Sequence, residues 1–259
     1  MTIDVDPDWW KTLFDEVYLI TDARSVDNDR VTRQEIDFFT ALISLQPHER
    51  ILDLCGGHGR HSMELYRRGF HNCTVLDFSQ PLLNIGATNA ARKRYAIRFM
   101  QGDARDTPLI SGTFDHVLLL GNSLGYISEP DADLLILKES WRLLKPQGCL
   151  LLDVTDGESV QSGMSPLAWH QIGDDIVVCR QREVDNGIIS AREMVLSKAR
   201  GLIRDRTYRI RLYSANDLAA LTGSAGFDDV QILPQTSAMQ STEDVGCMNH
   251  RLVITARKP

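Results

Sequence analysis

The sequence predicts an α/β protein with a mostly parallel sheet, helices on both faces of that sheet, and a small antiparallel β insert. Short apolar runs alternate with helical patterns between residues 50 and 154, as in repeated strand–helix–strand units. Three longer runs of β-type composition follow. Asn186-Gly187, between the first two, is typical of a tight hairpin because both residues tolerate positive φ. The 259 residues suit one large domain with an insert.

The first predicted strand is RILDL, which leads through a glycine cluster into a helix over residues 60–68. Gly69 is expected to end that helix, since glycine readily adopts the left-handed C-cap conformation. Ser79 and Pro81 suit the start of the helix after the second strand. Further strands are expected in CTVLDF, IRFMQGD, FDHVLLLGN and CLLLDV. Short apolar strands that alternate with helices favour a parallel sheet.

The C-terminal part completes a sheet of seven strands with a helix at 214–225 and strands at 229–233 and 250–257. The runs DIVVCRQREV, IISAREMVLSKA and RDRTYRIRLY predict an antiparallel insert over one end of that sheet. We expect the insert to act as a cap or as the contact of a homodimer. The expected division is an N-terminal helical lid segment (1–46), a core (47–155 and 214–259) and the insert (156–213).

Composition excludes several classes of protein. The net charge of −7 offers no basic footprint for nucleic acid. No apolar run approaches the ~18 residues that a membrane span needs. The five cysteines are scattered and lack paired spacing, which favours reduced thiols and a cytoplasmic location.

The glycine cluster Gly56-Gly57-His58-Gly59 lies where the first strand turns into a helix. A helix N-terminus presents unpaired N–H groups, and glycine lets a ligand lie directly against the backbone. At the carboxyl end of a parallel strand this favours a nucleotide-like ligand, either a dinucleotide or S-adenosylmethionine. The third position of the dinucleotide fingerprint is Ser62 instead of glycine, so the dinucleotide match is poor.

Three acids at the ends of successive strands favour S-adenosylmethionine. Asp53 would repel a pyrophosphate but attract an ammonium and a sulfonium group. Asp77 is placed to accept hydrogen bonds from both ribose hydroxyls, and Asp103 from an adenine amino group. We therefore expect the three carboxylates to contact three parts of one ligand.

These motifs, with Leu144-Lys145-Pro146-Gln147-Gly148 and the closing strand HRLVITARKP, resemble those of class I S-adenosylmethionine-dependent methyltransferases. The resemblance covers about residues 48–155 and 214–259. The version DLCGGHGRHSMEL, with a β insert ending RLYSANDLAAL, is similar to small-molecule methyltransferases, including sugar-amine N-methyltransferases. The chain departs from the pattern at Cys55, where the family has the first glycine of the loop.

The resemblance implies a Rossmann-like fold, S-adenosylmethionine as cofactor, and in-line methyl transfer to a nitrogen or oxygen atom of a small molecule. It also implies that an N-terminal tyrosine covers the cofactor. The aromatic segment with Trp9, Trp10 and Phe14 could form this lid, and Tyr18 is the expected residue. The expected cofactor-binding residues are Tyr18, Asp53, Cys55, Gly56, Gly57, Gly59, His61, Asp77, Phe78, Asp103, Ala104, Gly121 and Asn122.

The catalytic residues on the acceptor side stay unassigned, with Tyr126, His170 and Tyr213 as candidates. Eight arginines between residues 180 and 211 could bind an anion, but acids are interleaved with them. We therefore interpret them as a solvated or subunit-facing β surface. Cys55, His58 and His61 are interpreted as residues lining the loop, and no metal site is expected.

Three alternatives stay open. One is a nucleic-acid or protein methyltransferase, although the fourth strand lacks the Asn/Asp-Pro-Pro-Tyr/Phe run of base-amine enzymes. Another is a dinucleotide oxidoreductase, which Asp53 and the missing third glycine disfavour. The last is a protein that binds S-adenosylmethionine without catalysis.

Overall fold

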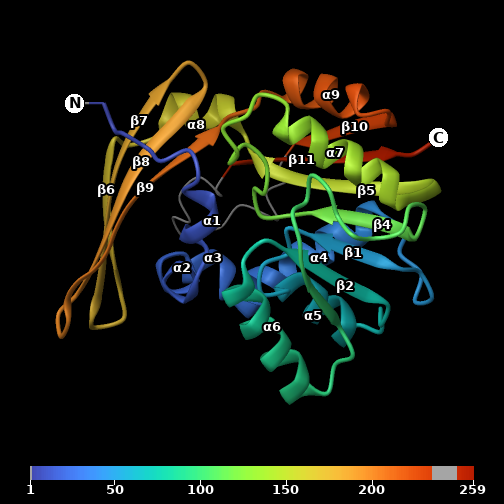
Figure 1. Ribbon diagram of the computed structural model, residues 1–259, viewed down its shortest axis with the longest axis horizontal. Coiled ribbons are helices and arrows are strands. Elements are labelled where there is room, and N and C mark those ends of the chain that lie inside the picture. The colour runs from blue at the N-terminus through green and yellow to red at the C-terminus, as the bar shows by residue number, and fades with distance from the viewer. Residues whose placement is uncertain (1, 235–249) are drawn as a thin grey trace.

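A computed structural model describes residues 2–234 and 250–259. In Figure 1 a four-stranded sheet stands at the left and a seven-stranded sheet at the right, with three short N-terminal helices between them. These helices are α1 (Trp10–Leu13), α2 (Glu16–Thr21) and α3 (Ala23–Val26). Within the described residues, no helix combines the length and the apolar character that crossing a membrane requires.

The seven-stranded sheet has the order β10-β11-β5-β4-β1-β2-β3. Parallel ladders join β1 to β2, β1 to β4, β2 to β3 and β4 to β5, whereas β11 runs antiparallel to both of its neighbours. The fold class expected from the sequence is thus confirmed. The strands are β1 (Ile51–Leu54), β2 (Cys73–Asp77), β3 (Arg98–Gln101), β4 (Phe114–Leu119), β5 (Leu144–Thr155), β10 (Asp228–Pro234) and β11 (Arg251–Arg257).

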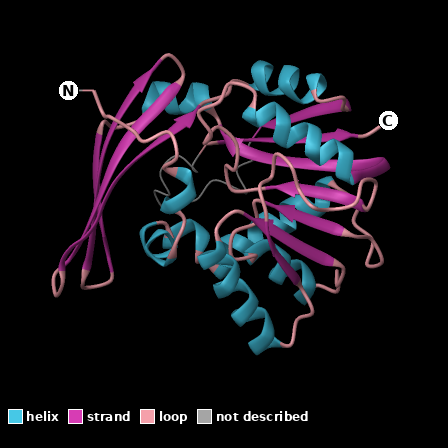
Figure 2. Cartoon of the chain, viewed as in Figure 1, coloured by secondary structure: helices cyan, strands magenta, loops and turns pink. Residues whose placement is uncertain are grey.

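Helices cover both faces of this sheet, as Figure 2 shows. Successive side chains of a strand point to opposite faces. Leu52 and Leu54 of β1 therefore pack in the cluster that contains Leu137 of α7, while Ile51 packs with Ile36 of α4 and Leu65 of α5. The helices are α4 (Asp29–Leu42), α5 (Arg60–Arg67), α6 (Gln80–Lys93), α7 (Ala132–Leu143) and α9 (Ala215–Ser224).

The helical pattern of the sequence is clear over residues 33–45, but α4 starts one turn before it. The helix begins at Asp29, because the side chain of Asn28 accepts hydrogen bonds from the backbone of Arg30 at 3.0 Å and Val31 at 3.2 Å. This N-cap satisfies donors that the first helical turn leaves without intrahelical partners. The extra turn contains Thr32, whose side chain is buried.

The four-stranded sheet has the order β6-β7-β8-β9, with antiparallel pairing throughout. Its strands are β6 (Leu167–Ile172), β7 (Ile176–Asp185), β8 (Ile188–Ser197) and β9 (Gly201–Arg211). Asn186 and Gly187 form the β7–β8 turn with φ values of 48° and 73°, as expected for this dipeptide. The sequence analysis found three of these strands, and did not find β6 or the preceding helix α8 (Gly157–Gly163).

Candidate functional site

A large cavity opens at the carboxyl ends of β1 to β4, beneath the N-terminal helices. It encloses about 1040 Å³ including its open mouth, and we call it the first cavity. The loops after the four strands and the aromatic side chains of the N-terminal segment contribute its walls. Its location is the one that ligands use in open parallel sheets.

The glycine loop forms the floor of this cavity. A Cβ atom on Gly56 would lie 2.6 Å from Cγ of Asp53, and one on Gly59 would lie 2.8 Å from Cε1 of Phe99. Gly59 also has a φ of 73° at the N-cap of α5. Cys55, at the family's first glycine position, adopts a φ of 59°. The loop thus keeps the left-handed backbone at Cys55 although a side chain is present.

Asp77 lines the first cavity and anchors two loop segments. Its Oδ2 accepts a hydrogen bond from the backbone N–H of Gly57 at 2.7 Å, and its Oδ1 accepts one from Ser79 at 2.8 Å. Burial raises the pKa of Asp77 to about 6, and the two backbone donors oppose that rise. Each carboxylate oxygen retains a further lone pair for a ligand.

Asp53 lies under the glycine loop and is 1% exposed. Its Oδ2 accepts a hydrogen bond from Oγ of Ser62 at 2.9 Å, whereas its Oδ1 has no hydrogen-bond partner among the described residues. Burial raises the pKa of its carboxyl group. Asp53 does not line the first cavity, but its carboxylate lies directly against Gly56, which does.

Asp103 lines the opposite end of the first cavity. Arg105 pairs with it at 2.7 Å, and this hydrogen-bonded ion pair lowers the pKa of the Asp103 carboxyl. The guanidinium of Arg105 also lies 5.6 Å from the ring centroid of Trp10. A charged, partly exposed acceptor therefore stands beside an aromatic ring at this end.

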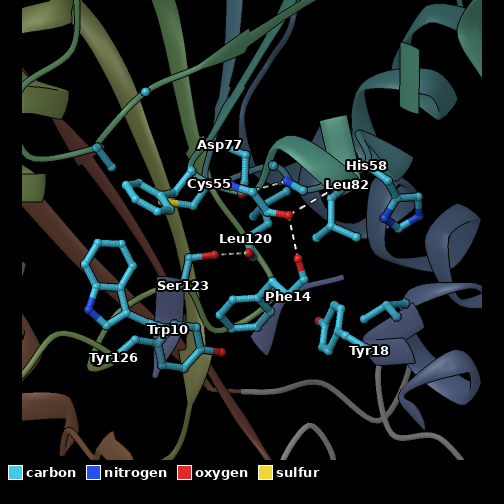
Figure 3. Close-up of a pocket in the computed structure, with 18 of the residues that line it drawn as sticks. Trp10, Phe14, Tyr18, Cys55, His58, Asp77, Leu82, Leu120, Ser123 and Tyr126 are labelled. Atoms are coloured by element: carbon cyan, nitrogen blue, oxygen red, sulfur yellow. Dashed lines mark hydrogen bonds between the residues drawn. The ribbon is translucent and has the colours of Figure 1, made fainter. Parts of the chain in front are cut away.

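An aromatic wall closes the first cavity on the side of the N-terminal helices (Figure 3). Phe14 lies between Tyr18 and Tyr126, with ring centroids 5.1 Å and 5.5 Å away. Trp10 packs edge-on against Phe78 at 4.7 Å. Trp10 and Phe14, which the sequence analysis named as candidates for the lid, line the first cavity.

The N-terminal segment is attached to both sheets. Oγ of Ser79, after β2, donates a hydrogen bond to the backbone oxygen of Phe14 at 2.5 Å. Asp15, the N-cap of α2, forms an ion pair with Arg204 of β9. The segment therefore bridges the seven-stranded sheet and the insert across the cavity mouth.

A second cavity of about 850 Å³ lies between the N-terminal helices, the loop after β4 and strands β7 to β9. It shares part of its lining with the first cavity, so the two spaces adjoin. The shared residues are Phe14, Tyr18, Val26, Arg60, Gly121 and Tyr126.

Most of the expected cofactor-binding residues lie together in the first cavity. Gly59 supports the loop without lining the cavity, and Asn122 lines the second cavity instead. The residues that do line the first cavity are Tyr18, Cys55, Gly56, Gly57, His61, Asp77, Phe78, Asp103, Ala104 and Gly121.

The three catalytic candidates are not brought together. Tyr126 lines both cavities, with its hydroxyl 3.5 Å from Nδ2 of Asn122. His170 and Tyr213 line neither. The hydroxyl of Tyr213 donates a hydrogen bond to Asp133 at 2.5 Å, and Asp133 accepts another from the backbone of Gly125 at 2.9 Å. Tyr213 thus helps to hold the loop that carries Tyr126.

The interpretation of the insert's eight arginines is wrong for three of them. The sequence analysis interpreted them as a solvated or subunit-facing surface, but Arg180, Arg182 and Arg204 line the second cavity. The side chains of Arg180 and Arg204 are only 10% and 6% exposed. Alternation along a strand shows which residues share a face, but not which face is covered. The N-terminal helices provide that cover.

A buried ion cluster lies beneath the glycine loop. Glu35 of α4 contacts Arg60, His61 at 3.0 Å, and Arg251 of β11, which also pairs with Asp153. Burial alone would raise the pKa of Glu35, but the two guanidinium groups outweigh it and hold that pKa well below its usual range. His61 thus lines the first cavity with one nitrogen held by Glu35.

Comparisons with known proteins agree with this geometry. Residues 51–148 match a family model described as a methyltransferase domain. The chain is 27% identical over 240 residues to YqeM of Bacillus subtilis, a protein assigned to the methyltransferases, covering 90% of this chain and 95% of YqeM. It is 30% identical over 161 residues to a glycine/sarcosine N-methyltransferase of Aphanothece halophytica, covering 61% of this chain and 60% of that protein.

The chain is a class I S-adenosylmethionine-dependent methyltransferase. The sugar N-methyltransferase KedS8 of a Streptoalloteichus species has the same fold as this methyltransferase, with a TM-score of 0.70 at 19% identity. That superposition covers 100% of this chain and 97% of KedS8. Dinucleotide oxidoreduction, one of the alternatives above, is set aside by the family match.

The first cavity of the methyltransferase fits its cofactor, S-adenosylmethionine. Its glycine loop has no room for further side chains at Gly56 and Gly59. Strand-end carboxylates line it at Asp77 and Asp103, and the aromatic wall is apolar. S-adenosylmethionine carries an ammonium group, a sulfonium group and a nucleoside. Its cationic groups match the carboxylates of the cavity, and its nucleoside matches the aromatic rings.

Proposed function

We propose that the enzyme transfers the methyl group of S-adenosylmethionine to a nitrogen or oxygen atom of a small molecule in the second cavity. The observation that carries the proposal is the wall common to the two cavities, in which Phe14, Gly121 and Tyr126 take part. A cofactor in one space and an acceptor in the other would meet at this wall. The acceptor space is concave and is lined by aromatic side chains together with charged groups, as small-molecule sites are.

In this proposal the strand-end acids orient the cofactor. Asp77 accepts hydrogen bonds from both ribose hydroxyls through its remaining lone pairs, and Asp103 accepts one from the adenine amino group. The partnerless Oδ1 of Asp53 draws the ammonium group toward the glycine loop. The segment 1–46 acts as a lid, with Tyr18 over the cofactor.

The cofactor, when bound, supplies both the methyl group and its leaving group. The protein's task is then to align the accepting atom with the carbon–sulfur bond. Oδ1 of Asn122 accepts a hydrogen bond from the backbone of Thr155 at 2.8 Å, which fixes the side chain with Nδ2 toward the hydroxyl of Tyr126. We propose that this pair orients the accepting atom. The buried surroundings favour an amine in its neutral, nucleophilic form.

The relatives support a small acceptor. Both the glycine/sarcosine N-methyltransferase and the sugar N-methyltransferase act, by their names, on nitrogen atoms of small molecules. The net charge of −7 disfavours a nucleic-acid acceptor.

An isotope-transfer assay tests the proposed function. The protein is incubated with S-adenosylmethionine labelled with tritium in the methyl group and a whole-cell extract, and the products are then separated by size. We expect the label in the low-mass fraction. Label confined to nucleic acid or protein would contradict the proposal. Binding of S-adenosylhomocysteine without any transfer would favour the non-catalytic alternative.

We also propose a homodimer through the outer face of the insert. Leu167 and Trp169 of β6 are 70% and 72% exposed there, and Leu202 is 57% exposed. Apolar side chains grouped on an exposed face mark interaction surfaces. Light scattering tests this proposal, and a monomer for the wild-type protein would contradict it.

The proposed location is the cytoplasm. Cys55, Cys73, Cys149 and Cys179 are free thiols, and Cys247 lies outside the described residues. Thiols persist in the reducing conditions of that compartment. Fractionation of cells that produce the tagged protein would contradict the proposal if the protein were found outside it.

A further inference from the structure

Charged side chains are unusually frequent in the lining of the second cavity. Of its four arginines, three hold carboxylates: Arg60 pairs with Glu35, Arg180 with Asp22 and Glu193, and Arg204 with Asp15. The Arg180 contacts are well formed, with Nε 2.8 Å from Glu193 and Nη2 3.1 Å from Asp22. Their positive charge is therefore used within the protein.

Arg182 differs from these three. It lines the same cavity from β7, on the strand face that also carries Arg180. Among the described residues no carboxylate lies within ion-pair distance of it, and its Nε is buried without a hydrogen-bond partner. Its register neighbour on β8 is Ala191, which has no polar side chain. Nη1 of Arg204 also makes no hydrogen bond, but it lies 3.8 Å from Oε1 of Glu193 in an ion pair, so Arg182 is the distinct case.

The unpartnered buried Nε of Arg182 favours an acceptor that comes from outside the chain. A buried donor without a partner is unfavourable, and more so when it belongs to a charged group. A ligand that accepts the hydrogen bond recovers this cost. The planar fork of a guanidinium matches a carboxylate with two parallel hydrogen bonds.

The remaining walls of the second cavity are largely aromatic. The ring of Trp9 lies 5.4 Å from that of Tyr126 and 5.8 Å from that of Tyr208, measured between centroids. Ile210 adds an aliphatic surface. Tyr126 lines both cavities, whereas Arg182 lines only the second. An occupant that reaches from one residue to the other would have an apolar middle and an anionic end.

We propose that the methyl acceptor is a carboxylic acid with an apolar ring, whose carboxylate binds Arg182 while the ring packs against Trp9 and Tyr208. The proposal rests on the proposed function and names its substrate class. The accepting atom lies at the other end of the molecule, beside Tyr126. Arg182 is then a specificity-determining residue at a distance from the methyl group.

Calorimetry with model ligands tests the subsite directly. The wild-type protein is saturated with S-adenosylhomocysteine and titrated with phenylacetate, its neutral analogue phenylacetamide, and phenyl phosphate. A charge-assisted hydrogen bond contributes about 1.5–3 kcal/mol, so phenylacetate should bind roughly 10–100-fold more tightly than phenylacetamide. Equal affinities, or no binding of either, would overturn the proposal. Tighter binding of phenyl phosphate than of phenylacetate would overturn the carboxylate assignment.

Variants assign the effect to Arg182. Arg182→Gln should abolish the preference for phenylacetate, and Arg182→Lys should restore part of it. Arg209→Gln is the matched control, because Arg209 is an exposed arginine of β9 that lines neither cavity. The variants must bind S-adenosylhomocysteine as the wild type does, which shows that they fold. A preference that survives in Arg182→Gln would overturn the proposal.

The labelled product of the isotope-transfer assay separates this proposal from the proposed function. A small labelled product retained by an anion exchanger at neutral pH is the expected result. A small product that is not retained would overturn the carboxylate but leave the proposed function intact. Label in macromolecules alone would overturn both.

Discussion

The two cavities are built in different ways. The floor of the first is formed by loops that directly follow successive strands, so that Asp77 accepts a hydrogen bond from Gly57, 20 positions away, and the N-terminal segment adds only one wall. The second is formed by side chains from distant segments, as in the pairs of Asp22 with Arg180, 158 positions apart, and of Asp15 with Arg204, 189 positions apart. The fold itself creates the first cavity, whereas the second depends on how the insert and the N-terminal segment meet.

The largest expected effect compares the buried ion cluster beneath the glycine loop with an exposed ion pair of the insert. Glu35→Ala should lower the free energy of unfolding by about 3–5 kcal/mol, because it leaves the buried Arg60 and Arg251 without this partner. Asp205→Ala is the matched control in the insert, where the pair with Arg192 is exposed, and it should leave stability almost unchanged. Urea denaturation measures both. Equal losses of unfolding free energy in the two variants would contradict this difference between the buried cluster and the exposed pair.

The next prediction tests whether the glycine loop of the first cavity must lack a side chain at Gly56. In Gly56→Ala the new Cβ would lie 2.6 Å from Cγ of Asp53, so the loop must shift. Overpacking of this kind costs about 1–3 kcal/mol of stability, and because the loop that shifts lines the first cavity, we expect roughly 10-fold weaker binding of S-adenosylhomocysteine by calorimetry. Gly223→Ala is the control, since nothing lies within 4 Å of its added Cβ. Unchanged affinity in Gly56→Ala would contradict the proposed role of the loop.

The proposed ribose contact predicts a pH dependence. Hydrogen bonds from ribose hydroxyls favour the ionised carboxylate of Asp77, whose pKa burial raises to about 6. Protonation therefore competes with the cofactor, so affinity should be full well above pH 6 and fall about tenfold per unit below it. Calorimetry across this window measures the effect. Asp77→Asn should bind more weakly at pH 8 and lose this dependence, and an unchanged profile would exclude Asp77 as the group responsible.

The smallest effect concerns Cys55. Its φ of 59° costs an ordinary residue about 1–2 kcal/mol, while a glycine loses about 0.5–1 kcal/mol through its greater freedom in the unfolded chain. Cys55→Gly should therefore change stability by no more than about 1 kcal/mol and leave cofactor affinity intact. Cys55→Val should destabilise clearly, since β-branched residues tolerate positive φ poorly. Thermal unfolding compares the two, and equal losses would contradict this explanation.

The sequence predicts the first region better because its signals are local. The glycine loop, Asp77 and Asp103 each follow an apolar run directly, so the strand assignment also places them at one edge of the sheet. Asp53 shows the limit of this reasoning. Its position at the strand end was clear, but only the packed structure shows its carboxylate under Gly56, where it supports the loop.

The second region could not be predicted from local patterns. The acids that neutralise Arg180 and Arg204 come from the N-terminal helices, and nothing near the insert in the sequence indicates that pairing. Strand β6 also escaped prediction, because it is an edge strand that is stabilised by its ladder with β7. Tertiary contacts override local preference in such strands.

The contacts of the N-terminal segment have a consequence for the order of events in a catalytic cycle. Phe14 and Tyr18 face both cavities, and Ser79 ties this stretch to the glycine-loop side while Arg204 ties it to the insert. Displacing the stretch to empty one compartment therefore uncovers the other as well. We expect the spent cofactor and the methylated product to depart through a shared opening, so that one movement resets the enzyme for the next turnover.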